Sequence, residues 1–222
     1  MSILSLQSVR YSYSSKYHTV EVLNDVSCSF EQGLIYAIIG KSGSGKSTML
    51  SLMAGLDLPN EGDVLFHGIS TRTFDLDKYR RNNVAMIYQS FRLFPRLTAL
   101  ENVMYPMELQ GVSPRDAIKS AKEHIISVGL TDKVFNRFPS MLSGGEQQRI
   151  AIARALAMNT NIILADEPTG NLDSTNSRNI ITLLAHLAHE RNYCVVVVTH
   201  DMGILDRMDI TYQMRDGILV KK

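Results

Sequence analysis

A glycine-rich segment of the chain has the composition of a phosphate-binding loop. Residues 40–47 read GKSGSGKS and match G-x-x-x-x-G-K-[ST], after an apolar run and before a helical pattern. Glycines let backbone N–H groups approach an anion, and the start of a helix adds about half a positive charge. The sequence therefore predicts that this loop binds the phosphates of a nucleotide. The residues assigned to it are Gly40, Lys41, Ser42, Gly43, Ser44, Gly45, Lys46, Ser47 and Thr48.

Three of these residues have side chains that can act on a nucleotide directly. Lys46 is expected to reach the β- and γ-phosphates, and the Ser47 hydroxyl is expected to ligate Mg²⁺. Thr48 can add a hydroxyl contact to the α-phosphate. The loop thus predicts a site for a nucleotide together with its magnesium ion.

Two adjacent acids follow a second apolar run. Residues 161–165 predict a buried strand, and Asp166 and Glu167 come directly after it. Because ligands of α/β proteins bind at the carboxyl ends of parallel strands, Asp166 is expected near Mg²⁺, through a water molecule. Glu167 is expected beside the water molecule that attacks the γ-phosphate. In isolation such a pair would as readily cap a helix or solvate a turn, so the catalytic interpretation depends on the phosphate loop.

Alternating strand and helix patterns predict the elements that position these residues. Residues 3–30 alternate polar and apolar positions, which favours antiparallel strands around a turn rich in Tyr and Ser. The remaining pattern predicts a parallel sheet covered on both faces and a closing hairpin. Strands are expected at 34–39, 64–66, 84–88, 162–165, 194–199, 210–214 and 218–220, and helices at 48–54, 145–158 and 175–191.

Between Ser90 and Leu142 the strand pattern is replaced by two helical patterns. They cover 99–110 and 114–128, with Pro114 at a first helical position. We expect a single domain over 1–222, with a catalytic core at 1–89 and 143–222 and a helical subdomain at about 90–142. Apolar residues after Gln89 are expected either to dock a partner or to pack inside the helical lobe: Phe91, Leu93, Phe94, Leu97, Met104, Tyr105 and Met107.

Composition excludes several classes of protein. With 222 residues, 45% hydrophobic and 20% charged, the chain is long and apolar enough for a globular core. A net charge of +1 gives no global field for nucleic acid. The longest strongly apolar run, 194–198, is too short to span a bilayer, and the first residues resemble no secretion signal, so we expect a cytosolic address. Cys28 and Cys194 are expected to be buried reduced thiols.

Two further clusters predict no chemistry. His186 and His189 are three residues apart on a helix, but a third metal ligand is not evident, which favours solvated histidines. Asp75 and Asp77 accompany a basic cluster, which favours a solvated face over contact with nucleic acid. That cluster comprises Arg72, Lys78, Arg80, Arg81, Arg92 and Arg96.

The segment LSGGEQQR at 142–149 resembles the signature of ATP-binding cassette proteins. The phosphate loop, Gln89, the two acids, Asp173 and His200 follow in the family's order, so the resemblance covers essentially the entire chain. It implies the α/β fold of a P-loop NTPase, with a RecA-like mixed-sheet core, an N-terminal antiparallel β subdomain and a helical signature subdomain. It also implies an ATPase that uses ATP and Mg²⁺ as a head-to-tail dimer, with itself or a homologous ATPase as partner.

The resemblance implies a contact in trans for the residues around the signature. Ser143, Gly144, Gly145 and Glu146 open a helix whose N-terminus suits anions, and they would contact the nucleotide of the opposite domain. Asp173 would cross the dimer interface and couple the two sites.

Three more roles are implied within the chain. Gln89 would contact Mg²⁺ and the attacking water, and His200 would contact the γ-phosphate; with Lys46 and Glu167 they form the expected catalytic set. Tyr13 corresponds best to the aromatic residue that stacks on adenine. Tyr11, two residues away on the same strand, is the alternative.

Further segments resemble one branch of the family. ADEPTGNLDS at 165–174, YQS at 88–90 and LENV at 100–103 resemble the ATPases of macrolide exporters, lipoprotein-releasing systems, antimicrobial-peptide resistance pumps and haem-detoxifying exporters. The branch implies a separate transmembrane permease, driven from the cytoplasmic face of the membrane for export or for moving an extracytoplasmic segment. Regulation of a membrane partner without solute transport, as in cell division, is the alternative. The cargo is not predicted, because the permease selects it.

Two other functions fit the sequence less well. Cassette ATPases that act on DNA or ribosomes have long coiled coils or two cassettes in one chain, and neither pattern occurs here. An unrelated P-loop kinase would leave the segment from Ser143 to Gln148 and His200 unexplained.

Overall fold

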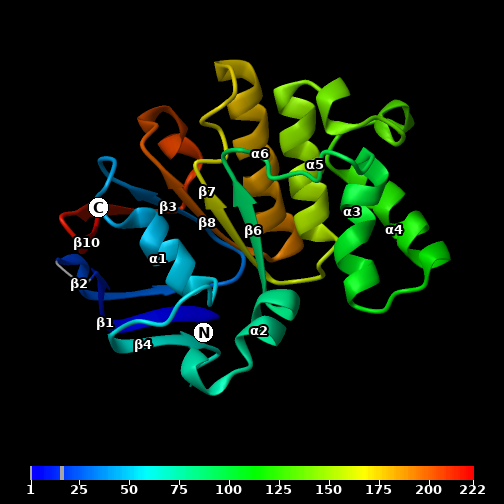
Figure 1. The fold of residues 1–222 in the computed structure, drawn as a ribbon. Helices are drawn as coiled ribbons and strands as arrows, with labels where there is room; N and C mark the ends of the chain where they lie inside the picture. Colours follow the sequence, from blue (N-terminus) through cyan, green and yellow to red (C-terminus); the bar gives the residue numbers. More distant parts are fainter. Residues whose placement is uncertain (1, 16–17) are drawn as a thin grey trace.

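The computed structural model of the chain describes residues 2–15 and 18–222 and contains two β-sheets with helices packed around them (Figure 1). One sheet has the strand order β10-β9-β3-β8-β7-β6 and the other has the order β2-β1-β4-β5. The strands are β1 Leu4–Ser14, β2 Thr19–Phe30, β3 Ile35–Ile39, β4 Glu61–Phe66, β5 Ile69–Ser70, β6 Val84–Tyr88, β7 Ile162–Asp166, β8 Cys194–Thr199, β9 Ile210–Arg215 and β10 Ile218–Lys221.

The helices of the described residues fall into two kinds. The α-helices are α1 Lys46–Met53, α2 Leu76–Asn82, α3 Ala99–Leu109, α4 Pro114–Ser127, α5 Gly144–Leu156 and α6 Ser174–Arg191. Short 3₁₀ helices cover Thr71–Thr73, Asp132–Val134, Pro139–Met141 and Met202–Arg207. Within residues 2–15 and 18–222, none of these helices has the length and apolar character needed to cross a membrane.

The larger sheet is parallel except at one edge. Strands β6, β7, β8, β3 and β9 run in the same direction, and β10 pairs antiparallel with β9. Successive side chains of a strand point to opposite faces, so β8 contributes to two separate cores. Val195 and Val197 pack with α5 and α6, whereas Cys194, Val196 and Val198 pack with α1 and the antiparallel sheet. The parallel sheet is therefore covered on both faces, as the sequence predicts.

The helical segment that interrupts the strand pattern shares its core with the sheet. Helices α3 and α4 lie beside α5, on the right of Figure 1. Met104 and Met107 of α3 are buried in the same cluster as Ala85 and Ile87 of β6. The interpretation of Met104 and Met107 as docking residues is therefore wrong, because both fill the core. Phe94 and Tyr105 instead remain 41% and 37% exposed, with ring centroids 4.7 Å apart.

Several element boundaries differ from the expected ones. Helix α1 begins at Lys46 rather than Thr48, inside the glycine-rich motif. Helix α2 was not expected, although Asp75 caps it by accepting hydrogen bonds from the N–H groups of Asp77 and Lys78. The short strand β5 and the 3₁₀ helices were not expected either, and the remaining helices and strands lie within a few residues of their predicted ranges. Residues 16 and 17 of the turn rich in Tyr and Ser lie outside the described residues.

Candidate active site

A cavity of about 670 Å³ opens at the carboxyl ends of the parallel strands. Its size is typical of a pocket for a small organic ligand. The phosphate loop follows β3, and the acid pair and His200 lie at the ends of β7 and β8, so the sheet brings them together. The lining residues are Tyr13, Val22, Ser42, Gly43, Gly45, Lys46, Ser47, Thr48, Gln89, Asp166, Glu167 and His200.

The phosphate loop is held by close backbone packing. Gly45 has φ +106°, and a Cβ atom there would lie 2.7 Å from the carbonyl oxygen of Val22. A residue with a side chain would therefore be strained and would clash. No side chain of the described residues caps the first turn of α1, which begins directly after Gly45. The helix N-terminus is thus left to bind an anion.

The Lys46 side chain lies across the loop. It is only 6% exposed, and its Nζ donates hydrogen bonds to the carbonyl oxygens of Gly40, at 2.9 Å, and Lys41, at 2.8 Å. Gly40, Lys41 and Ser44 line a different cavity, of about 320 Å³, beside the β9–β10 hairpin. These three residues were expected in the phosphate site. Their role in phosphate binding stays a prediction, and the carbonyl groups of Gly40 and Lys41 hold the Lys46 ammonium group.

Asp166 lies beside Ser47 in the wall of the cavity. The Ser47 hydroxyl donates a hydrogen bond to Asp166 Oδ1 at 3.0 Å. Burial raises the pKa of the Asp166 carboxyl above its ordinary value, the nearby Glu167 charge raises it further, and the Ser47 hydrogen bond lowers it. A hydroxyl and a carboxylate therefore present oxygen atoms side by side.

Glu167 is held in an unusual backbone conformation. Its φ is +49°, in the left-handed region, and its N–H donates to the carbonyl oxygen of Val198 at 2.9 Å. Such a conformation costs about 1–3 kcal/mol for a residue other than glycine, and it occurs often at functional sites. Glu167 Oε1 lies 2.8 Å from His200 Nδ1, and Oε2 accepts a hydrogen bond from Thr199 Oγ1 at 3.2 Å. The carboxylate is therefore fixed by two partners at the cavity wall.

The structure distinguishes the two candidate aromatic residues. Tyr13 lines the cavity, is 54% exposed, and has its hydroxyl 3.3 Å from Thr48 Oγ1. Tyr11 is buried and donates its hydroxyl hydrogen to Asp57 Oδ2. Tyr13 is therefore the one of the pair with a ring available to a ligand in this cavity.

The signature segment lies at the start of α5 and does not line the cavity of its own chain. The Ser143 hydroxyl donates to Glu146 Oε2 at 2.9 Å and accepts from the Glu146 N–H at 3.3 Å, so the two residues form a capping box. A Cβ atom on Gly145 would lie 2.7 Å from Asn176 Oδ1, so this glycine also permits α5 to approach α6. Gly144 lies in the same first turn.

Asp173 caps the N-terminus of α6 within its own chain. It is the N-cap of α6 and accepts hydrogen bonds from the N–H groups of Thr175 and Asn176. These bonds, with one from the Asn176 side chain, lower the pKa of the Asp173 carboxyl. The sequence interpretation named Asp173 only for a contact across a dimer and missed this capping role, which an Asp before a helical pattern could have indicated.

Three residues that line the cavity or contact its lining residues were also missed from the sequence. Thr199 holds Glu167, Val22 of β2 lines the cavity, and Asn171 contacts Gln89. Thr199 directly precedes His200, which was a usable signal. Val22 and Asn171 come from distant parts of the chain, and spacing alone gives no indication of such contacts.

The two weaker clusters are solvated or paired. His189 Nε2 lies 2.9 Å from Asp209 Oδ2, and among the described residues no group of three or more His, Cys, Asp or Glu side chains could hold a metal ion. In the basic cluster, Arg80 pairs with Asp77 and Arg72 lies 3.3 Å from Asp63. The cysteines are free thiols, with Cys194 buried and Cys28 only partly buried.

Comparison with known proteins identifies the family. The sequence model described as "ABC transporter" matches residues 23–170. The chain belongs to the ABC transporter family. It is an ATPase cassette of that family, it binds ATP, and its motifs resemble those of the lipoprotein-release and macrolide-export branch.

Similar proteins agree with this assignment over nearly their full lengths. The chain is 39% identical over 222 residues to YclH of Bacillus subtilis (strain 168), an uncharacterized ABC transporter ATP-binding protein, covering 100% of this chain and 97% of the relative. It is 42% identical over 217 residues to the lipoprotein-releasing system ATP-binding protein LolD of Rickettsia bellii (strain RML369-C), covering 98% and 97%.

Solved structures of a related cassette share the fold. The dimeric structure of MJ0796, a bacterial ABC transporter cassette, superposes with a TM-score of 0.90 at 39% identity, over 99% of this chain and 97% of that chain. The dimeric post-hydrolysis state of MJ0796, bound to ADP and Pi, gives the same values.

Proposed function

We propose that this ABC ATPase hydrolyses ATP at a site that a second cassette completes, and that it drives a transmembrane permease. The observation that carries the proposal is the Glu167 carboxylate, held by His200 and Thr199 at the wall of the phosphate-loop cavity. A carboxylate fixed in this way can accept a proton from an attacking water molecule. The left-handed backbone of Glu167 supports this role, because such strained residues occur often at functional sites.

The cavity has oxygen donors that suit Mg²⁺. The Ser47 hydroxyl and the Asp166 carboxylate lie side by side, and the Gln89 carboxamide lines the same cavity. Mg²⁺ prefers such hard ligands and usually keeps waters and substrate phosphates rather than a complete protein cage. When bound, the ion would neutralise charge that develops on the phosphates. Ser47, Gln89 and Asp166, the last through a water molecule, would hold it.

The other lining residues would bind and orient ATP. Lys46 and the uncapped N-terminus of α1 carry positive charge toward the phosphates. The exposed face of Tyr13 would stack on adenine, with its hydroxyl close to Thr48. His200 would contact the γ-phosphate while it orients Glu167. Each of these groups is supplied by one chain.

The signature segment would supply the remaining contacts from a second chain. Ser143, Gly144, Gly145 and Glu146 lie at a helix N-terminus that does not line the cavity of its own chain. The dimeric structures of the related MJ0796 cassette support a head-to-tail pair, and the second chain would be another copy or a homologous ATPase. Asp173 would contribute near the same interface.

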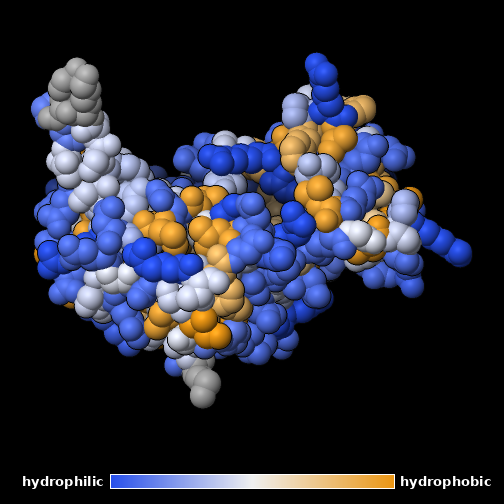
Figure 2. Space-filling view, turned by 60° about the horizontal axis from the view of Figure 1, so that its bottom comes forward, coloured by the Kyte–Doolittle hydropathy of each residue, from blue (hydrophilic) through white to orange (hydrophobic). Residues whose placement is uncertain are grey.

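Similarity to LolD supports a membrane partner and the direction of transport. LolD is the ATP-binding protein of a lipoprotein-releasing system, so export or movement of an extracytoplasmic segment is the favoured role for this chain. The permease would hold the cassette at the cytoplasmic face of the membrane. Phe94 and Tyr105, exposed on the helical lobe, would contribute to the docking surface. Figure 2 shows several hydrophobic groups among polar ones on the right, over this lobe.

The substitution Glu167→Gln tests the catalytic assignment. Steady-state ATP hydrolysis should fall by about 10²- to 10⁴-fold, because the amide cannot accept the proton. ATP affinity should stay within about twofold, since Gln has the same size and can still accept a hydrogen bond from Thr199. The matched control, Glu190→Gln on the exposed end of α6, should hydrolyse ATP at the unchanged rate. Hydrolysis by Glu167→Gln at the wild-type rate would overturn the proposal.

A further inference from the structure

Two amide side chains from distant segments form a reciprocal pair at the edge of the cavity. Gln89 Nε2 donates to Asn171 Oδ1 at 3.4 Å, and Asn171 Nδ2 donates to the backbone carbonyl oxygen of Gln89 at 2.9 Å. Gln89 follows β6, and Asn171 lies in the loop between β7 and α6. Both side chains are exposed, so the pair is not part of a buried core.

The backbone beside Asn171 is shaped to receive the same glutamine. A Cβ atom on Gly170 would lie 2.6 Å from Gln89 Nε2 and 3.0 Å from Gln89 Cδ. The Gly170 N–H donates to the Glu167 carbonyl oxygen at 3.1 Å, which closes the turn that begins at the proposed base. The Gln89 carboxamide therefore packs on one short turn that connects Glu167 with Asn171.

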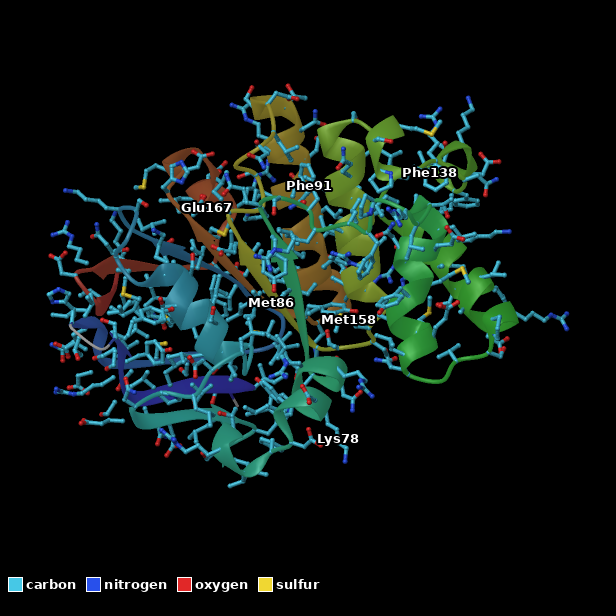
Figure 3. The ribbon with its side chains drawn as sticks, in the orientation of Figure 1. Lys78, Met86, Phe91, Phe138, Met158 and Glu167 are labelled. Atoms are coloured by element: carbon cyan, nitrogen blue, oxygen red, sulfur yellow. The ribbon has the colours of Figure 1, made fainter. Side chains whose placement is uncertain are left out.

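The first turn of α5, which carries the signature segment, lies close to the loop of Asn171 and to Phe91. A Cβ atom on Gly144 would lie 3.3 Å from Leu172 Cδ2, 3.7 Å from the Asn171 carbonyl oxygen and 3.8 Å from Phe91 Cζ. In Figure 3 the labelled Phe91 and Glu167 lie at the same end of the sheet. The segment after Gln89 and the loop that carries Asn171 therefore meet at Gly144.

The segment after Gln89 is also tied to the signature helix by one arginine. Arg154 of α5 donates to the carbonyl oxygens of Phe91, at 3.1 Å, and Arg92, at 2.7 Å. Phe91 and Arg92 have φ values of +58° and +47°, so this segment holds two left-handed residues in succession. The backbone after Gln89 is therefore fixed to α5, while the Gln89 side chain itself is hydrogen-bonded to Asn171.

We propose that Asn171 is a positioning residue for the ATPase reaction, which holds the Gln89 carboxamide in the cavity and couples it to the signature end of its own chain. The inference rests on the proposed role of Gln89 at Mg²⁺ and the attacking water. Asn171 does not line the cavity, whereas Gln89 does, so Asn171 acts through Gln89. Its loss leaves the nucleotide-binding residues unchanged and lets the carboxamide rotate away from the reacting atoms.

A double-mutant cycle tests this coupling in the chain of 222 residues. Asn171→Ala, Gln89→Ala and the double variant are compared for kcat and KM of ATP hydrolysis, for ATP affinity and for Tm. Asn171→Ala should lower kcat about tenfold, with KM and ATP affinity within about twofold, because the lost contacts act on geometry and not on binding. In the Gln89→Ala background, Asn171→Ala should cause no further loss. Asn161→Ala, at an exposed asparagine away from the cavity, is the matched control.

The results separate this inference from the proposed function. If the Asn171→Ala and Gln89→Ala losses multiply in the double variant, Asn171 acts without Gln89 and the inference is wrong, while the proposed role of Glu167 stands on its own assay. If Gln89→Ala keeps the wild-type kcat, the proposed role of Gln89 fails and the inference fails with it. A fall in Tm that accounts for the loss in Asn171→Ala would show a structural role and would also overturn the inference.

Discussion

Two helix N-termini in this protein lie in glycine-containing motifs, with the glycines before α1 and inside the first turn of α5, yet their backbone N–H groups are capped differently. Helix α1 begins after Gly45, and no side chain of the described residues caps it. Helix α5 begins after Ser143, whose hydroxyl and backbone N–H form a capping box with Glu146. The start of α1 lies in the cavity with Lys46 and Ser47, whereas the start of α5 lies outside the cavity of its own chain.

Under the proposed function, the difference would correspond to two kinds of anion site. At α1 the backbone N–H groups are left for phosphate, so local stability is given up in favour of binding. At α5 the capping box satisfies the first turn within the single chain, so in the proposed dimer a ligand of the other chain would meet a preformed helix end. Substitutions at the two ends should therefore separate binding from folding, and the following predictions are arranged from the largest expected effect to the smallest.

Lys46→Met should abolish most ATP binding. The ammonium group supplies charge-assisted hydrogen bonds, each worth about 1.5–3 kcal/mol, so ATP affinity should fall by about 10²-fold or more. Thermal stability without nucleotide should fall only modestly, because Met fills a similar volume but loses the hydrogen bonds of Lys46 to the carbonyl groups of Gly40 and Lys41. Titration with a fluorescent ATP analogue measures the affinity. Lys119→Met, on exposed α4, is the control, and equal affinities for the two variants would contradict the assignment.

Gly45→Ala and Gly43→Ala form a matched pair within the loop. Both glycines have positive φ, +106° and +78°, but only Gly45 has a neighbour, the Val22 carbonyl oxygen, where the new Cβ atom would lie. Gly43→Ala should lower the free energy of unfolding by about 1 kcal/mol, and Gly45→Ala by about 2–3 kcal/mol. Urea denaturation of both variants measures this difference. Equal losses would show that Val22 does not constrain the loop.

Ser143→Ala should lower the free energy of unfolding by about 1 kcal/mol, because a helix cap is lost. ATP affinity of the single chain should be unchanged, and ATP hydrolysis should fall. Ser113→Ala removes the cap of α4, which has the same hydrogen bond to an N3 backbone N–H, without touching the signature. The two variants should lose similar stability in chemical denaturation. A similar loss of hydrolysis in both would refute a special role for Ser143.

Asp166→Asn should raise Tm slightly at neutral pH in the absence of nucleotide. Burial raises the folded-state pKa of Asp166, so the native chain binds more protons than the unfolded chain between the two pKa values. The contribution of this group to stability is therefore most favourable at low pH and falls as pH rises through that window. The amide removes the buried charge and can still accept the Ser47 hydrogen bond. Melting curves between about pH 4 and 8 should show that the Tm of Asp166→Asn declines less steeply with rising pH than the Tm of the wild type.

The pKa of Asp173 is shifted in the opposite direction to that of Asp166, so the effect of pH on stability should also be opposite. Hydrogen bonds at the start of α6 lower its folded-state pKa, so its contribution to stability is present above the unfolded-state pKa and is lost as pH falls. Asp173→Ala should therefore lower Tm at neutral pH, where Asp166→Asn raises it. A shift in the same direction for both variants would contradict the charge assignments.

Much of the fold was predictable because its patterns are local. Continuous apolar runs such as 194–199 indicate strands covered on both faces, and the glycine motif indicates a helix N-terminus. Helix α2 was missed because its seven residues contain few apolar side chains, although Asp75 was available as a capping signal. The start of α1 was misplaced because the motif itself contains its first turn.

The less predictable features depend on contacts between distant segments. Met104 and Tyr105 are adjacent, yet one is buried and the other exposed, because the packing of α3 against its neighbours decides which face is covered. Tyr11 and Tyr13 have ring centroids 5.0 Å apart, yet Tyr11 is buried with its hydroxyl on Asp57, whereas Tyr13 lines the cavity. Gly40 packs against the β9–β10 hairpin, which lies far away in the sequence, so the spacing of the motif could not indicate this contact.

The central claim is that the phosphate-loop cavity and the signature end of α5 are two halves of one site that two chains complete. Sedimentation of Glu167→Gln with saturating ATP tests it most directly, alone and combined with Ser143→Arg. The account predicts a two-chain particle for Glu167→Gln that requires ATP, and a single chain for the double variant under the same conditions. A single chain for Glu167→Gln with ATP bound, or equal dimer formation with Ser143→Arg, would contradict it.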